Sequence, residues 1–430
     1  MTALTAPAHP ARKDVALIGL VGLAHSISHF SQLLLPPLFP WLKEAFGVSY
    51  TELGLLMTIF FVVSCIVQAA SGFVVDRFGP RPVLFGGLAL LGVAAFGYAA
   101  SPSYGAMALC TVVAGVGNGV FHPVDFTLLN RKVHASRLGH AFSAHGITGS
   151  LGWALAPVMV VPLAMAYSWR VALASAGALA FTVLAVLWFN RAQLALDIPA
   201  LKRAAEVPGG MGREGNFDFL KIPAVWMCFG FFFFFAASLS GVQTFAPAAA
   251  QMLHGVPVGI TAMCITIYMV CSAAGMVAGG FLAADPARCE RIIAAGFGVA
   301  AGVALVIGFA DISPLAVPVL FGLMGFGAGM AGPSRDLIVK RAAPPGATGR
   351  VYGVVYSGLD IGQAIAPLAY GALMDRHHPA LVWLGIAVVQ ALLIVNAFNV
   401  RRARRTPLVA AVAWPGAGVA PGRARIGHDL

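Results

Sequence analysis

The chain has 430 residues, of which 59% are hydrophobic and only 10% are charged, and its mean hydropathy is +0.85. A soluble domain could not cover this much apolar surface, so the composition excludes an ordinary soluble enzyme or binding module. The net charge of +11 does not indicate a nucleic-acid-binding protein, because the basic residues lie in short links between long apolar runs.

These apolar runs predict transmembrane helices, since about 20 residues are enough to cross about 30 Å of hydrocarbon. Twelve runs are long enough, and they predict an all-α membrane protein with twelve transmembrane helices. In chain order the predicted spans are 15–41, 50–75, 82–100, 104–128, 139–166, 169–189, 222–250, 258–284, 291–310, 313–338, 350–373 and 380–400.

The links between the spans concentrate their positive charge on one side of the membrane. By the positive-inside rule this side is cytoplasmic, which places both termini in the cytoplasm of a bacterial-type inner (plasma) membrane. Only Lys43, Arg170 and Arg376 fall on the opposite side. The basic residues expected on the cytoplasmic side are Arg12, Lys13, Arg77, Arg81, Arg131, Lys132, Arg137, Arg288, Arg291, Lys340, Arg341, Arg350 and those of 401–405.

Residues 115–157 and 325–367 form an internal repeat with a constant offset of 210 residues and no gap. A match of this length is hard to obtain by chance from an Ala- and Gly-rich composition. It indicates a duplicated six-span unit and predicts two pseudo-symmetric six-helix bundles. The matched pairs are Gly115 and Gly325, Gly117 and Gly327, Gly119 and Gly329, Pro123 and Pro333, Arg131 and Arg341, Gly139 and Gly349, Gly152 and Gly362, and Pro157 and Pro367.

The longest polar stretch between spans divides the chain into halves, and its position agrees with the repeat offset. The sequence therefore predicts five regions. They are a cytoplasmic N-terminus (1–14), an N-terminal six-helix bundle (15–190), a cytoplasmic linker (191–221), a C-terminal six-helix bundle (222–400) and a disordered cytoplasmic tail (401–430).

A short motif lies between the second and third predicted spans and contains Gly72, Asp76, Arg77, Gly79 and Arg81. It resembles the G-x-x-x-D-[RK]-x-G-[RK] signature of the major facilitator superfamily, and the spans, the repeat and the basic central loop extend the resemblance over nearly the whole chain. We expect Gly72 to allow close helix approach and Asp76 to accept hydrogen bonds from a neighbouring helix N-terminus. The arginines are expected to hold the cytoplasmic side.

Two further segments resemble the fosmidomycin-resistance-type exporter branch of that superfamily. The first is His25-x-x-x-His29 followed by LLLPPLFP, and the second is FHP around His122. The branch has an aspartate where this chain has His29 and a glutamate where it has Val124, while Asp125 comes one position later. One position turns a helical side chain by about 100°. The resemblance implies a proton-coupled exporter of small drugs, but the branch's acidic residues do not transfer to this chain.

The superfamily resemblance implies that the first, fourth, seventh and tenth spans line a central cavity, where ionisable residues are usually functional. Asp360, in the eleventh span, lies ten residues after Arg350, which is about 15 Å along a helix and near mid-membrane. We expect it to carry protons, and the alternative is a protonated aspartate hydrogen-bonded to a neighbouring backbone.

Asp125 and Arg335 occupy matching repeat positions near the cytoplasmic ends of cavity-lining spans. They are expected to pair as a gate when that side of the molecule closes. The alternative is that Asp125 pairs locally, with Arg131 or with a group of the fifth span, while Arg335 reaches the lipid headgroups.

His25 and His29 share one face of the first span, because they are four residues apart. Histidine titrates near physiological pH, which suits proton coupling or anion binding. His122 and His145 are weaker candidates, with helix bending and packing as their alternative roles. Two histidines without a nearby carboxylate or thiolate make a poor metal site, so no metal is expected. Uncharged candidates for substrate contact are Gln32, Gln243 and Tyr356.

The sequence contains no P-loop, no HExxH motif and no supported nucleophile arrangement, so we expect no enzyme, no cofactor and an ion gradient as the energy source. The favoured function is a proton-coupled antiporter that exports a small organic compound or drug by alternating access. It would act as a monomer in the lipid bilayer, with protons and a small-molecule substrate as partners and no nucleic acid. The alternatives are an uptake symporter of a small organic anion and a non-transporting membrane sensor on the same fold.

Overall fold

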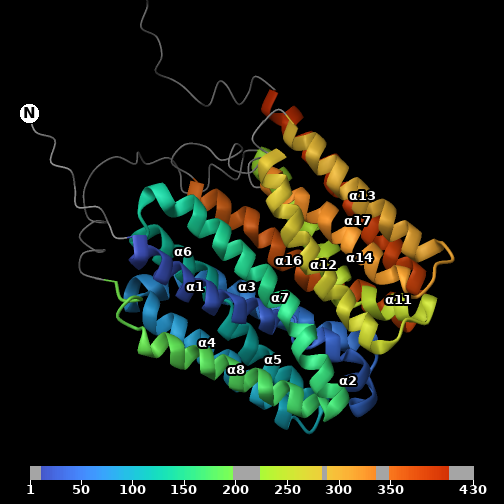
Figure 1. The fold of residues 1–430 in the computed structure, drawn as a ribbon, viewed down its shortest axis with the longest axis horizontal. Coiled ribbons are helices and arrows are strands. Elements are labelled where there is room, and N and C mark those ends of the chain that lie inside the picture. Colours follow the sequence, from blue (N-terminus) through green and yellow to red (C-terminus); the bar gives the residue numbers. More distant parts are fainter. Residues whose placement is uncertain (1–10, 197–222, 283–287, 336–347, 406–430) are drawn as a thin grey trace, which may run out of the picture.

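The computed structural model describes residues 11–196, 223–282, 288–335 and 348–405, and all regular elements in these ranges are helices (Figure 1). Eleven segments among them have the length and hydropathy of a membrane span. The remaining predicted span is occupied by α16 (Thr348–Asp375), a helix of 28 residues. The predicted all-helical membrane fold is therefore confirmed.

The elements of the first half are α1 (Ala11–Gln32), η1 (Pro36–Leu38), α2 (Phe39–Phe46), α3 (Tyr50–Phe78), α4 (Pro80–Ala100), α5 (Tyr104–Asn118), α6 (Phe121–Lys132), η2 (Ala135–Arg137), α7 (Leu138–Ala166) and α8 (Trp169–Phe189). Those of the second half are α10 (Pro223–Thr244), α11 (Ala246–His254), α12 (Val258–Leu282), α13 (Cys289–Phe309), α14 (Ala316–Met330), α16 and α17 (Pro379–Arg405).

Four of the predicted spans are interrupted rather than continuous. The first breaks between α1 and α2 around Pro36 and Pro37, the fourth between α5 and α6 at Gly119, the seventh between α10 and α11 at Phe245, and the tenth after α14 at Ala331. Proline cannot donate a backbone hydrogen bond, which explains the first break and favours the third, because Pro247 opens α11. Interrupted helices in a membrane are tolerated where they are buried in protein or line a cavity.

Three helix starts of the first half follow from their cap residues. The Ser49 side chain accepts a hydrogen bond from Glu52 N, and the Glu52 side chain accepts one from Ser49 N, so α3 begins with a capping box. Ser103 and Ser168 cap α5 and α8 in the simpler way, through one side-chain bond each. These local signals explain why the connections there are short.

The repeated glycines have the same structural role in both halves: they allow close contact between neighbouring helices. A Cβ atom on Gly115 would lie 2.8 Å from the Phe60 carbonyl oxygen of α3. Its repeat partner Gly325 abuts the Tyr268 carbonyl of α12 in the same way. Glycine at these positions allows backbone-to-backbone packing without a side chain between the helices. The same packing in both halves requires glycine at matching positions, which explains why the repeat can be recognised in the sequence.

The two halves meet along two seams, α3 against α16 and α7 against α12, in the middle of the molecule (Figure 1). Along the first seam Thr58 Oγ1 donates to the Ala364 carbonyl at 2.6 Å, and along the second Thr266 Oγ1 donates to the Ala154 carbonyl at 2.9 Å. We call the end of the molecule that carries Tyr50 and the C-terminus of α16 the Asp375 end. By charge bias it is the predicted outer side.

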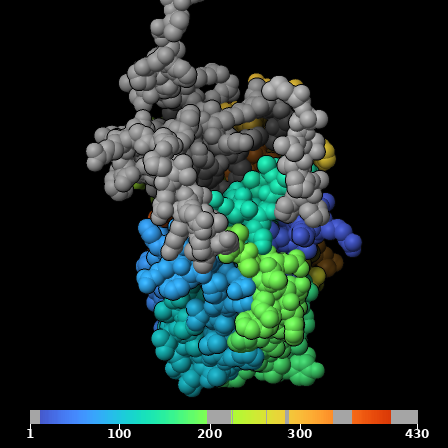
Figure 2. Space-filling view, turned by 90° about the vertical axis from the view of Figure 1, so that its left-hand side faces the viewer, coloured from blue at the N-terminus to red at the C-terminus, as the bar shows by residue number. Residues whose placement is uncertain are grey.

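Large apolar side chains cover the outer faces of the helices. Phe73, Phe189 and Phe281 are 79%, 82% and 80% exposed. Figure 2 shows one such face of the first half, where the segments drawn in blue, teal and green pack side by side. Exposure of this kind is costly in water and favourable in hydrocarbon, which agrees with a multi-pass membrane protein.

Candidate functional site

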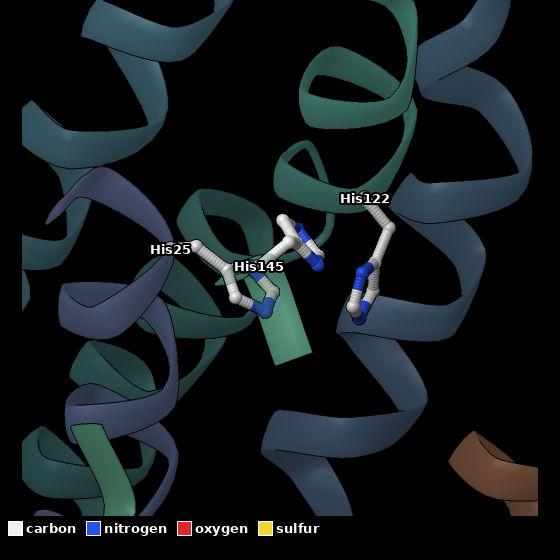
Figure 3. A group of neighbouring side chains, drawn as sticks. All are labelled: His25, His122 and His145. Atoms are coloured by element: carbon white, nitrogen blue, oxygen red, sulfur yellow. The ribbon is translucent and has the colours of Figure 1, made fainter. Parts of the chain in front are cut away.

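Five ionisable side chains from three helices meet inside the first half: His25 and His29 of α1, His122 and Asp125 of α6, and His145 of α7. Four of them were predicted as site residues, and His145 was predicted as a weaker candidate. Figure 3 shows the imidazole rings of three of these histidines turned toward a common space. All but His122 are buried, and His122 is half-buried.

Asp125 is the centre of this cluster and is fully buried. Its Oδ2 atom lies 3.0 Å from His25 Nδ1 and 3.1 Å from His145 Nε2. The structure therefore shows the local alternative, a contact with the fifth predicted span. Pairing of Asp125 with Arg335 stays a prediction. It would require a conformation in which the two halves close at the end of the molecule opposite the Asp375 end.

The rings are held by close stacking. The centroids of His25 and His145 are 3.6 Å apart, those of His25 and His29 are 4.3 Å apart, and His29 lies 4.2 Å from the ring of Trp153. A Cβ atom on Gly149 of α7 would lie 2.8 Å from His29 Cε1, so this glycine makes the room for the rings. The helix α7 thus packs, at Gly149, against the predicted histidine face of α1.

A second, uncharged network adjoins the cluster and includes the predicted residue Gln32. Gln32 Nε2 donates to Asn118 Oδ1 at 3.2 Å, and its Oε1 accepts from Trp153 Nε1 at 3.1 Å. Asn118 also accepts from Ser28 Oγ at 2.7 Å and donates to Ser64 Oγ at 2.8 Å. These bonds tie α1, α3, α5 and α7 together, so Gln32 has a packing role here.

Arg335 follows α14 in the second half and is half-buried. Its guanidinium carbon lies 4.6 Å from the centroid of the Phe235 ring and 5.3 Å from that of Phe232, both on α10. Such contacts stabilise a cation over an aromatic face. Two phenylalanine side chains of α10 therefore hold this cation.

Asp360 lies on the seam between the halves. Its Oδ2 atom accepts a hydrogen bond from Gln68 Nε2 of α3 at 3.0 Å. The Cys65 thiol, one turn earlier on α3, faces the same carboxyl group. The carboxyl group is half-buried, and a Cβ atom on Gly72, one turn beyond Gln68, would have no neighbour within 4 Å. Asp360 is thus the last residue on this side of the seam for which the described residues show a hydrogen bond between the two halves.

The other predicted contacts are not part of the histidine cluster or lie outside the described residues. Gln243 is buried at the end of α10, in a small cavity that Pro36 and Phe39 of the first half also line. The side chain of Tyr356 lies outside the described residues. Asp336, which the sequence places next to Arg335, also lies outside them.

The motif between α3 and α4 departs from its predicted roles in part. No atom of the described residues lies within 4 Å of a Cβ atom on Gly72, so the close helix approach expected of this glycine stays a prediction. Asp76 and Arg77 are exposed, and the predicted bond from Asp76 to a helix N-terminus is not among the hydrogen bonds of the described residues. Gly79 ends α3 with a φ of 85°, which only glycine adopts readily, and Arg81 lies in the first turn of α4.

Gln68 and Asp375 are among the polar residues at the seam that were not predicted. Gln68 is the partner of Asp360. The signal that could have found it is a lone amide in an apolar span. Asp375 accepts hydrogen bonds from Tyr50 N at 2.7 Å and Thr51 N at 2.9 Å. No sequence signal identifies it, because its partners are more than 300 residues away along the chain.

The same cluster overturns the argument against a metal. That argument assumed two histidines without a carboxylate, whereas the structure adds Asp125 and two further histidines. One nitrogen atom from each of His25, His122 and His145 lies within 4.8 Å of the others. Among the described residues these three form the group able to hold a metal ion.

Comparison with known proteins agrees with this fold. The chain matches the family model described as Major Facilitator Superfamily over residues 21–367 and 265–423. It is 28% identical over 169 residues to an uncharacterized MFS-type transporter, YfnC, of Bacillus subtilis strain 168, and the alignment covers 39% of each chain. It is 26% identical over 165 residues to the fosmidomycin resistance protein of Escherichia coli K12, covering 36% of this chain and 38% of that protein. The alignments thus span about two fifths of these curated relatives.

A solved structure, that of a bacterial homolog to the human lysosomal transporter Spinster, matches with a TM-score of 0.73 at 14% identity, over 95% of this chain and 100% of that one. Other matches are named as a multidrug resistance protein B homolog, a nucleoside transporter and a membrane sensor protein. The relatives therefore differ in function while the fold is shared. The family model covers most of the sequence, and the chain belongs to the major facilitator superfamily.

Proposed function

We propose that the protein is a proton-coupled antiporter that exports a small organic compound across a bacterial inner membrane, with both termini in the cytoplasm. The observation that carries the proposal is Asp360, a carboxyl group at the seam between the halves, bonded to Gln68 of the other half. Ionisable groups within membrane spans are costly to keep and usually functional.

The position of Asp360 couples its charge to the movement of the halves. On the Asp375 side of it, α3 and α16 are in contact, and on the other side no atom of the described residues lies within 4 Å of a Cβ atom on Gly72. Water can solvate a carboxylate from this other side, and that solvation is lost when the halves close over it. Closing the halves over a neutral carboxylic acid costs less free energy than closing them over a carboxylate. Proton uptake by Asp360 therefore favours closure, and proton release favours opening.

Export is supported by the resemblance of the first and fourth spans to the fosmidomycin-resistance-type branch and by the match to the Escherichia coli fosmidomycin resistance protein. The test compares drug susceptibility of a deletion strain with that of an overexpressing strain, with fosmidomycin in the panel and a protonophore control. Resistance should rise with expression and collapse with the protonophore. No shift for any compound, with a growth defect on an organic acid instead, would overturn export.

Asp360→Asn tests the proton path directly. The amide keeps the size and a hydrogen-bonding group but cannot exchange a proton, so we expect transport driven by a pH gradient to fall to background in proteoliposomes. Substrate binding without a gradient should persist. Asp311→Asn, an exposed carboxyl group on the link before α14, is the matched control and should transport normally. Normal coupled transport by Asp360→Asn would remove this residue from the path.

Uptake of a small organic anion is the second candidate, and Arg335 favours it. Its guanidinium group is half-buried over two phenylalanine rings of α10, which is a site that could attract a carboxylate. Arg335→Gln should then abolish uptake of the anion while leaving export of neutral or cationic compounds unchanged. Equal loss for both kinds of compound would indicate a structural role instead.

A further inference from the structure

The feature that the proposed function leaves unused is the histidine cluster of the first half. His25, His122 and His145 come from three different helices, α1, α6 and α7, and each places one ring nitrogen within 4.8 Å of the other two. Asp125 Oδ2 lies 3.0 Å and 3.1 Å from the nearest nitrogen atoms of His25 and His145. Three imidazoles and one carboxylate therefore converge on one point from several directions.

One hydrogen bond, between His145 Nε2 and Asp125 Oδ2 at 3.1 Å, lies at this point, and the other buried polar atoms around it lack partners among the described residues. Asp125 Oδ1, His122 Nδ1 and both ring nitrogens of His29 are buried without a partner. His25 Nδ1 is close to the carboxylate but outside hydrogen-bond geometry. Buried polar atoms without partners are rare, and each one calls for an explanation such as a bound ion or water.

The donor set selects the kind of ion. Neutral imidazole nitrogen is a good ligand for zinc and its neighbours among the divalent transition metals, and a carboxylate oxygen completes a four-coordinate set. Magnesium and calcium prefer sets made of oxygen atoms, and copper(I) prefers sulfur. The doubly charged ion would also neutralise the one carboxylate that is otherwise buried among rings.

We propose that the first half of the protein binds a divalent transition-metal ion of the zinc class at His25, His122 and His145, with Asp125 as the fourth ligand. The ion would cross-link α1, α6 and α7. His122 is the half-buried member of the cluster, and its neighbour Phe126 is 38% exposed, so an ion can enter along α6.

The test uses the purified full-length chain in detergent, free of any affinity tag, with Co²⁺ as a coloured probe and Zn²⁺ in equilibrium dialysis. The wild type should bind one ion at this site, give the visible spectrum of four-coordinate Co²⁺ and unfold at a higher temperature when Zn²⁺ is present. The triple variant His25→Gln, His122→Gln, His145→Gln should lose all three effects. The triple variant His134→Gln, His140→Gln, His377→Gln changes exposed histidines and should keep them.

His122→Cys separates ligation from folding. If His122 is a ligand, a thiolate in its place should add a sulfur-to-cobalt charge-transfer band while the chain elutes and unfolds like the wild type. Equal binding by both triple variants, or a folded His122→Cys protein without the new band, would show a hydrated histidine cluster and overturn the proposal. Asp360→Asn should still bind Co²⁺, so failure of the proton path and failure of the metal site are distinguishable.

Discussion

At the scale of single residues, one carboxylate organises the polar interior of the first half. Asp125 contacts His25 of α1 and His145 of α7 through the same oxygen atom. The family resemblance drew attention to His25, His29 and His122, and the offset of the repeat drew attention to Asp125. The sequence could not predict that these residues meet His145, because helical spacing shows which residues share a face and not which faces meet.

A methyl group at Gly149 should disturb this cluster. Gly149→Ala would place a Cβ atom 2.8 Å from His29 Cε1 and 3.1 Å from His25 Nε2, so the rings must move. Overpacking of this kind costs about 1–3 kcal/mol, and we expect a lower unfolding temperature and reduced transport. Gly146→Ala, one turn earlier on α7, meets nothing within 4 Å and is the control. Equal behaviour of the two variants would contradict this packing.

At the scale of helices, the sequence predicted where the spans are and missed how some of them break. The run 15–41 reads as one span, yet α1 ends at Gln32 and α2 begins at Phe39. Prolines within membrane helices usually bend rather than end them, so composition alone did not reveal the break. The structure also shows a cap between the halves: Asp375, at the end of α16, accepts hydrogen bonds from the backbone amides of Tyr50 and Thr51 at the start of α3. No local sequence pattern encodes such a long-range contact.

This cap should weaken when its charge is removed. Asp375 lies two residues beyond the predicted span 350–373. Burial alone would raise its pKa, but the hydrogen bonds from Thr51 and Tyr50 and the charge of Lys43 outweigh burial and lower the pKa overall. Asp375→Asn keeps the shape and loses the charge-assisted bonds, so the amides of Tyr50 and Thr51 should exchange hydrogen faster.

The pH dependence has a definite sign. A carboxylate with a lowered pKa stabilises the contact above its ordinary pKa, and this contribution is lost as pH falls through the lowered value. Hydrogen exchange measured by mass spectrometry should therefore show a protection difference between wild type and Asp375→Asn at neutral pH that shrinks in acid. Asp311→Asn should match the wild type throughout. A difference that does not change with pH would assign the contact to shape rather than charge.

At the scale of the whole molecule, the duplication and the membrane fold were predictable, and the conformation was not. Hydrogen bonds between the halves run from Tyr50 and Asp375 to Gln68 and Asp360 along one seam. Beyond them, a Cβ atom on Gly72 of α3 or on Gly146 of α7 would meet no atom of the described residues within 4 Å. The halves are thus in contact toward the Asp375 end. A sequence pattern shows which residues are apolar or repeated and does not indicate which conformation of a two-bundle fold is populated.

If transport requires this end to open, a link across it should stop the cycle. Thr51 Oγ1 lies 2.6 Å from Asp375 Oδ2, so Thr51→Cys with Asp375→Cys, in a background without the six native cysteines, places two thiols within reach of a disulfide or a short bifunctional reagent. We expect oxidation to abolish transport in proteoliposomes and reduction to restore it. Asp375→Cys alone loses the cap but cannot form the link, so it should be insensitive to oxidant. Full transport by the linked protein would show that the two halves do not separate here, and the cycle would then have to proceed with α3 and α16 fixed at the Asp375 end.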